Sequence, residues 1–126
     1  MITGFVNAEL EALVRLSVLD AQGEEHEIEA VIDIGYNGFL TLPPATIAVL
    51  KLTHFGREPV RLADGRREIF DLYLTSIIWD GQPKSIVVDA AETEPLMGTA
   101  LLAGYDLHVR FALNGPVVIE SFSPQE

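Results

Sequence analysis

Apolar and polar residues alternate along much of this chain, which is the pattern of strands with one buried face. Between residues 9 and 20, every even-numbered residue from Leu10 to Val18 is apolar. Residues 20–24 have the composition of a turn, and the alternation resumes over residues 27–32. We therefore predict a β-hairpin whose second strand ends at Asp33.

The rest of the pattern predicts further short strands and two short helices. We expect strands or hairpin arms at residues 39–42, 60–70 with its continuation to 78, 85–89, 105–113 and 116–122. One helix is predicted at residues 45–50, after a pair of prolines, and another at residues 99–104, which end in glycine. Asp-Gly and Asn-Gly pairs supply the hairpin turns.

Together these elements predict an all-β, mostly antiparallel fold. It is best described as a closed or folded-over barrel of roughly seven or more strands with two short helices. At 126 residues, of which 48% are hydrophobic, the chain is expected to form one domain over residues 1–126. A core of that size needs no cofactor merely to hold it together.

The amino-acid composition excludes several classes of function. The chain has no cysteine, which excludes disulfides, thiolate metal sites and cysteine nucleophiles. Its 19 acidic and 8 basic residues give a formal net charge of -11, a field that repels nucleic-acid phosphates. His26, His54 and His108 have no neighbour at a familiar ligand spacing, so neither a metal site nor a cofactor is predicted.

The N-terminal segment carries acidic residues early and lacks a basic region. No apolar run approaches the length needed to span a bilayer. The lack of cysteine also fits a reducing compartment. We therefore expect a soluble, cytoplasmic protein with no membrane partner.

The most informative segment is the turn that begins at Asp33, where the predicted hairpin ends. It reads Asp33-Ile34-Gly35-Tyr36-Asn37-Gly38. Placing a carboxylate beside apolar residues is costly, so an aspartate at the end of an apolar strand usually has a function. A glycine two residues later lets water or a substrate approach that acid closely. Taken alone, this short motif also fits an ordinary Asx turn.

Several elements occur in an order that is hard to obtain by chance. They are an apolar strand with its Asp-x-Gly turn, the segment 38–43, a Leu-Ala-Asp-Gly hairpin at 62–65, and the segment 96–98 before a small helix. In this order the chain resembles the retropepsin-like aspartic proteases, in particular their small prokaryotic members, over about residues 2–122.

The resemblance implies a half-enzyme whose Asp33 is the catalytic acid. Its active-site loop would then comprise Ile34, Gly35, Tyr36, Asn37 and Gly38. The hairpin of residues 60–70 would be its flap, with the flap residues Leu62, Ala63, Asp64, Gly65 and Arg66 and a tip near Asp64 and Gly65. Leu96, Met97 and Gly98 would pack beside the loop. Two chains would pair so that their Asp33 carboxyls share one proton and activate water, without a metal or another cofactor.

The loop departs from the family pattern at Ile34, where the family has threonine or serine. In the family that hydroxyl hydrogen-bonds across the dimer beneath the acids, whereas isoleucine has neither a donor nor an acceptor. We therefore expect a weaker dimer, or a less well aligned pair of acids, than in a relative that carries threonine.

Three functions follow from these observations. The first is a homodimeric aspartic endopeptidase that hydrolyses a peptide or protein substrate through the Asp33 pair. The alternative is a dimer of the same fold that is catalytically weak or inactive and serves as a peptide-binding or interaction module, which Ile34 favours. A small-ligand β-barrel explains the alternation, but it leaves the Asp33 turn, the hairpin and the segment 96–98 unrelated.

Overall fold

Ten β-strands, hydrogen-bonded into a single sheet, make up most of the part of the chain that the structure describes. The computed structural model describes residues 1–61 and 64–122. In chain order the elements are β1 (Ile2–Val6), β2 (Ala12–Leu19), β3 (Glu25–Ile32), β4 (Leu40–Leu42), α1 (Pro44–Leu50), β5 (Thr53–Arg61), β6 (Arg67–Trp79), β7 (Gln82–Ala90), β8 (Leu96–Met97), the 3-10 turn η1 (Thr99–Leu101), β9 (Tyr105–Val109) and β10 (Pro116–Ser121).

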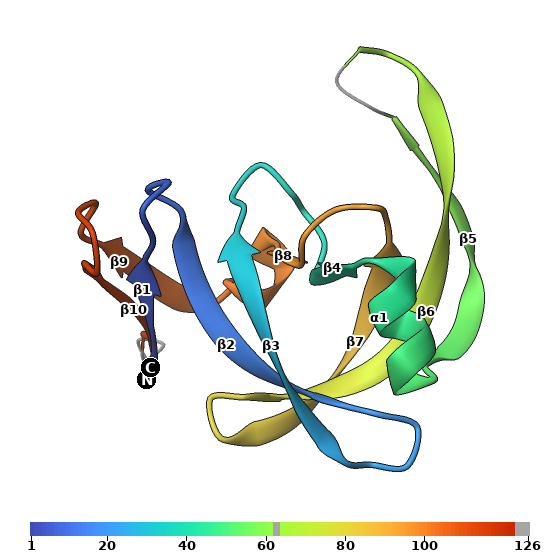
Figure 1. Cartoon of the computed structure of the whole chain (residues 1–126), viewed down its shortest axis with the longest axis horizontal. Helices are drawn as coiled ribbons and strands as arrows, with labels where there is room; N and C mark the ends of the chain where they lie inside the picture. Colours follow the sequence, from blue (N-terminus) through green and yellow to red (C-terminus); the bar gives the residue numbers. More distant parts are fainter. Residues whose placement is uncertain (62–63, 123–126) are drawn as a thin grey trace.

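The sheet curls so that part of it closes into a ring (Figure 1). Its strand order is β5-β6-β7-β4-β8-β3-β2-β1-β10-β9, and β6 also pairs with β2 through two residue pairs, Ser17 with Ile78 and Val18 with Ile77. β5 extends outward as one arm of a long hairpin with β6, and β1, β10 and β9 continue the sheet beyond β2. The prediction of a mostly antiparallel, closed β fold is confirmed.

Alternation along the strands builds the core inside this ring. In β2, Val14, Leu16 and Val18 are buried while Arg15 is exposed. The short strands β4 and β8 are buried almost throughout, and Met97 has no exposed surface. Each large apolar side chain removed from water contributes about 1.5–3 kcal/mol to stability. The strands that surround Asp33 are therefore held by the most buried part of the molecule.

One of the two predicted helices is wrong. The helix at Pro44–Leu50 is present, but residues 99–104 form only the single 3-10 turn η1. Nucleating a helix is unfavourable, and this short segment lies between Gly98 and Gly104, the latter with a φ of 90°. Over the described ranges, no helix has the length and apolarity required to cross a bilayer.

Other element boundaries also differ from the predicted ones. β1 was not predicted, and β5 begins at Thr53 rather than at residue 60. Most residues of β5 are exposed on both faces, so this strand lacks the alternation that identifies the others. The strand predicted at 105–113 ends at Val109, because the chain already turns over residues 110–115, where Ala112 N donates to the carbonyl of Arg110 at 2.9 Å and Gly115 N to that of Ala112 at 2.7 Å.

Candidate active site

Asp33 is the first residue after β3, at the start of the loop that leads to β4. Between β3 and β4 lies β8, which pairs in parallel with β3 through Ile32 and Met97 and antiparallel with β4 through Leu40 and Met97. The backbone N–H of Asp33 donates to the carbonyl of Met97 at 2.9 Å. Leu96 and Met97, which the resemblance placed beside the loop, thus fix both of its ends.

The carboxylate of Asp33 is oriented by its own loop. Oδ1 accepts a hydrogen bond from the backbone N–H of Gly35 at 2.9 Å, and the carbonyl of Asp33 accepts one from Tyr36 N at 3.1 Å. This is the Asx turn that the motif allowed. The side chain stays partly exposed, so the turn presents a carboxylate at the surface rather than burying it.

The ring of Tyr36 explains two of the glycines in the predicted site. It lies against Gly38 and Gly98, and a Cβ added to either glycine would come within 2.6 Å of a ring carbon. Gly98 also approaches the carbonyl of Gly38, where a side chain has no room. Thr99 N donates to the carbonyl of Tyr36 at 2.8 Å and Ala100 N to that of Gly38 at 3.1 Å. The segment that follows β8 therefore clamps the loop, and Gly98 makes the close approach possible.

Tyr36 also connects the loop to β7, because its hydroxyl donates a hydrogen bond to the Asp89 carboxylate. Burial raises the pKa of Asp89, the hydrogen bond from Tyr36 opposes that rise, and the charge of Glu58 adds to it. Burial, and then the bond to Asp89, raise the pKa of Tyr36. Sequence reasoning missed Asp89, although an acid at the end of an apolar strand is the same signal that identified Asp33.

A cleft of about 640 Å³ opens on the Gly35 side of the loop. Its walls come from the loop, β5, β6 and β7, and its lining residues are Gly35, Tyr36, Asn37, Gly38, Phe39, Phe55, Glu58, Pro59, Val60, Arg61, Leu72, Val87 and Asp89. Gly35 belongs both to this cleft and to the turn that orients Asp33. The cleft therefore begins next to the candidate acid.

An apolar groove of about 550 Å³ opens on the Ile34 side of the same loop. Its lining residues are Leu10, Glu11, Ala12, Val31, Ile32, Ile34, Leu107, Val109 and Phe111. Three of them are large and mostly exposed, namely Ile34 at 71%, Phe111 at 65% and Leu10 at 55%. They come from the turns β1–β2, β3–β4 and β9–β10, which lie at the same end of the strands that they connect (Figure 1).

The prediction that Leu10 lies on the buried face of a strand is wrong. This residue precedes β2 in a turn and has a φ of 61°, a left-handed conformation that costs a leucine roughly 1–2 kcal/mol. The turn is held by Asn7, whose Oδ1 accepts the backbone N–H groups of Glu9 at 3.1 Å and Glu11 at 2.9 Å. A strained backbone that displays an apolar side chain is a candidate functional feature.

The predicted flap corresponds to the hairpin of β5 and β6, which extends away from the rest of the sheet (Figure 1). Both of its strands contribute to the wall of the cleft. Leu62 and Ala63 lie outside the described residues. Asp64 accepts hydrogen bonds from the backbone N of Arg66 at 3.0 Å and from its Nε at 2.6 Å, and the first of these bonds is the main cause that lowers the pKa of Asp64. Gly65 has a φ of 88°, as an Asp-Gly turn requires.

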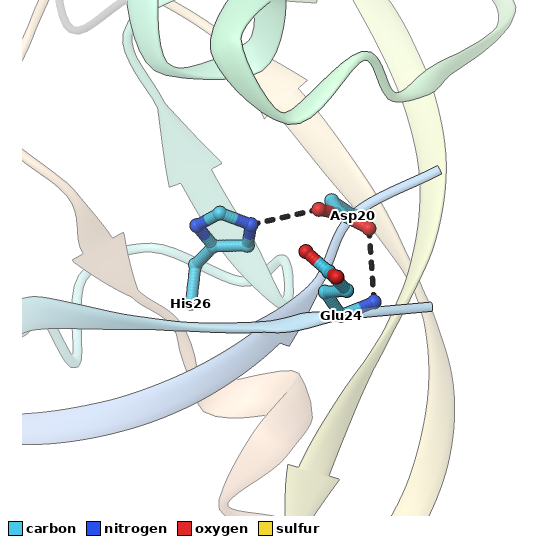
Figure 2. A group of neighbouring side chains, drawn as sticks. All are labelled: Asp20, Glu24 and His26. Atoms are coloured by element: carbon cyan, nitrogen blue, oxygen red, sulfur yellow. Dashed lines mark hydrogen bonds and ion pairs between the residues drawn. The ribbon is translucent and has the colours of Figure 1, made fainter. Parts of the chain in front are cut away.

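A separate group of titratable side chains lies on the turn between β2 and β3 (Figure 2). Asp20, Glu24 and His26 each place a side-chain ligand atom within 4.8 Å of the others, a proximity that sequence spacing did not predict. Oδ1 of Asp20 accepts the backbone N–H of Gln22 and of Glu24, and Oδ2 lies 2.8 Å from Nε2 of His26. The bond to His26 is the main cause that lowers the pKa of Asp20. These contacts account for Asp20 as a turn-forming residue.

No protein-family model matches this sequence. Among solved structures, the chain is similar to the crystal structure of a retropepsin-like aspartic protease from Rickettsia conorii, with a TM-score of 0.58 and 13% sequence identity. The match covers 97% of this chain and 91% of that chain. The chain therefore has the retropepsin-like aspartic protease fold, and the resemblance inferred from the order of its sequence elements is confirmed at the level of the fold.

Proposed function

We propose that this protein is a homodimeric aspartic endopeptidase in which the Asp33 residues of two copies form the catalytic pair. The observation that carries the proposal is the position of Asp33, partly exposed on a clamped loop between an apolar groove and an open cleft. The retropepsin-like fold supports the same assignment.

A second copy is needed because one carboxylate cannot act as acid and base in the same step. In the described part of the chain, the side chain of Asp33 has one hydrogen bond, from Gly35, and no second acid bonded to it. The groove offers a surface for pairing, because Leu10, Ile34 and Phe111 expose apolar area next to the acid. A twofold axis beside the loop would bury this surface in both copies and bring the acids together.

Two carboxyl groups about 3 Å apart cannot both ionise readily, so the pair holds one proton over a useful pH range. The ionised carboxylate takes a proton from the attacking water, whose oxygen bonds to the scissile carbonyl carbon. The protonated carboxyl transfers its proton to the carbonyl oxygen, which gives a tetrahedral diol. The diol then collapses: the newly protonated carboxyl gives its proton to the leaving nitrogen, the other carboxylate takes a proton from one diol hydroxyl to re-form the carbonyl, and the C–N bond breaks.

Ile34 favours a second function, a dimer that binds peptides without turnover. Isoleucine provides no hydrogen bond across the two loops, so the two acids of a dimer would be aligned without that bond. Under this alternative the cleft beside Tyr36 still holds an extended peptide. The two functions share the fold and the dimer, and they differ in chemistry at Asp33.

The deciding experiment measures cleavage of denatured casein between pH 3 and pH 7 by the wild-type chain and by Asp33→Asn. An asparagine retains the oxygen that accepts the Gly35 N–H, so the loop should stay in place while the acid is lost. We expect cleavage with an acidic optimum, inhibition by a statin-type peptide, and a loss of roughly a thousandfold or more in the variant.

Asp106→Asn is the matched control, because Asp106 is exposed on β9 and lines neither the groove nor the cleft. It removes the same charge and should retain activity. Peptide binding without cleavage at any pH would establish the second function instead. A chain that stays monomeric under assay conditions and still cleaves casein would refute the pairing of two Asp33 residues.

A further inference from the structure

The cleft beside the Asp33 loop carries a charge that its structural role does not require. On β7, Ile86 and Val88 point into the core, whereas Val87 and Asp89 line the cleft. Asp89 holds the Tyr36 hydroxyl, but an amide oxygen would accept the same hydrogen bond. An amide would also avoid placing a charge in a poorly solvated wall. Anchoring the loop therefore explains an acceptor at this position, but not an acid.

Glu58 brings a second negative charge to the same cleft. It lies on β5, and its charge raises the pKa of both Asp89 and Tyr36. In the part of the chain that the structure describes, neither Glu58 nor Asp89 forms an ion pair with a lysine, arginine or histidine. Arg61 lines the cleft at the end of β5 and contributes to neither pKa shift. A cation held between the two acids would relieve their repulsion.

The other walls suit the methylene stem of a basic side chain. The apolar lining comes from both arms of the flap hairpin and from β7, and consists of Phe55, Pro59, Val60, Leu72 and Val87. Lysine and arginine lay their stems along apolar surface while their charged ends reach a polar partner. A volume of about 640 Å³ accommodates such a side chain together with part of the peptide backbone. The formal charge of -11 also attracts cationic peptides to the molecule as a whole.

We propose, resting on the peptidase function above, that this cleft selects a lysine or arginine side chain of the substrate, with the Asp89 carboxylate as its charge partner and Glu58 as reinforcement. Gly35 links the cleft to Asp33, so the selected residue lies close to the scissile bond. Asp89 determines specificity and takes no part in proton transfer.

The test begins with the cleavage sites in denatured casein, mapped by mass spectrometry. We expect lysine or arginine to be enriched at one fixed position relative to the cleaved bond. The best site is then synthesised as two peptides that carry arginine or citrulline at that position, because citrulline has nearly the same shape without the charge. The readout is the ratio of kcat/KM for arginine over citrulline. We expect a ratio of roughly ten or more, as for a charge-assisted pair.

In Asp89→Asn, which keeps an acceptor for Tyr36, the ratio should fall to about one, whereas Asp106→Asn removes the same charge outside the cleft and should keep it. Glu58→Gln, on an exposed strand, should lower the ratio severalfold. If circular dichroism shows that Asp89→Asn does not fold, Glu58→Gln alone decides whether the acids of the cleft select arginine. A wild-type ratio near one, or an equal loss on both peptides in Asp89→Asn, would overturn the subsite.

Failure of the subsite is distinguishable from failure of the peptidase. If casein is not cleaved, the proposed function falls, and the subsite is tested by binding alone. The probes are then an alanine-based decapeptide with one arginine and its citrulline counterpart, titrated into the full chain by calorimetry. Tighter binding of the arginine peptide that disappears in Asp89→Asn would support the subsite, and equal binding of both peptides would refute it.

Discussion

The two hollows that flank the Asp33 loop have opposite chemistry, although the same loop contributes to both. The groove on the Ile34 side is lined mainly by apolar side chains, many of them exposed. The cleft on the Gly35 side contains Tyr36, Glu58 and Asp89 among apolar walls. Because consecutive loop residues face different sides, a single turn can present one surface to a second copy and another to a peptide.

The side chains proposed to act in the two hollows also differ in what supports them. The exposed apolar side chains of the groove, Leu10, Ile34 and Phe111, come from turns, whereas the two acids of the cleft, Asp89 and Glu58, come from strands β7 and β5. Sites on strands hold their side chains more precisely than sites on loops. This difference matches the proposed roles, since ligand selection demands fixed geometry while an apolar interface tolerates adjustment.

Among the changes that test this comparison of groove and cleft, the largest effect is expected from Phe111→Asp, which places a charge in the groove. In a twofold dimer the change occurs twice, and loss of one buried phenylalanine costs roughly 1.5–3 kcal/mol. Dimerisation measured by analytical ultracentrifugation should weaken by roughly a hundredfold or more, and casein cleavage should disappear below the new dissociation constant. Val49→Asp on α1, equally exposed but outside the groove, should change neither property. Unaltered dimerisation in Phe111→Asp would place the interface elsewhere.

Ligand selection in the cleft should respond to pH through Asp89. Burial raises the pKa of Asp89, so its charge is present above that raised value and is lost as pH falls through it. The titratable groups that face it are Tyr36 and Glu58, with Arg61 farther along β5. The arginine-to-citrulline ratio should therefore fall roughly tenfold at a higher pH than an ordinary aspartate would dictate. A ratio that stays constant between pH 3 and pH 7 would exclude Asp89 as the partner.

Alternation predicted the part of this fold where each strand has one buried face. It identified β2 and β3, and with them the position of Asp33 at a strand end. It failed for β5, which is exposed on both faces, and for Leu10, whose even position continued the pattern of β2 although its backbone is left-handed. Local patterns carry no information about a strand that packs on neither side.

The candidate site was predicted only as far as its residues adjoin in sequence. The Asp33 turn and the 96–98 segment are each continuous, and the resemblance related them to one another. Asp89 and Glu58 approach the loop only because β7 pairs with β4 in parallel, through Thr41 and Asp89, and β5 folds back along β6. The groove likewise assembles from β2, β3 and β9 and the turns next to them, which are distant in the sequence. No spacing rule relates such residues before the sheet is known.

Replacing Ile34 with threonine tests whether the groove compensates for the absent hydroxyl. Threonine could hydrogen-bond across the two loops, and one such bond contributes roughly 1 kcal/mol, or about fivefold in an equilibrium. It also removes apolar surface from the groove, which opposes tighter pairing. We expect higher kcat per dimer, by roughly severalfold, with a smaller change in dimerisation. If neither activity nor dimer affinity rises, the departure at Ile34 does not limit this protein.

The smallest expected effect is that of Tyr36→Phe, which removes one hydroxyl from the wall of the cleft. Its hydrogen bond opposes the burial that raises the pKa of Asp89, so the variant should raise that pKa further. The pH at which the arginine-to-citrulline ratio falls should therefore move upward, by less than one pH unit, while stability to urea drops by about 1 kcal/mol. Because Tyr36 does not line the groove, dimerisation should be unchanged. A variant that weakened the dimer as much as it shifted this profile would show that the two sides of the loop are not independent.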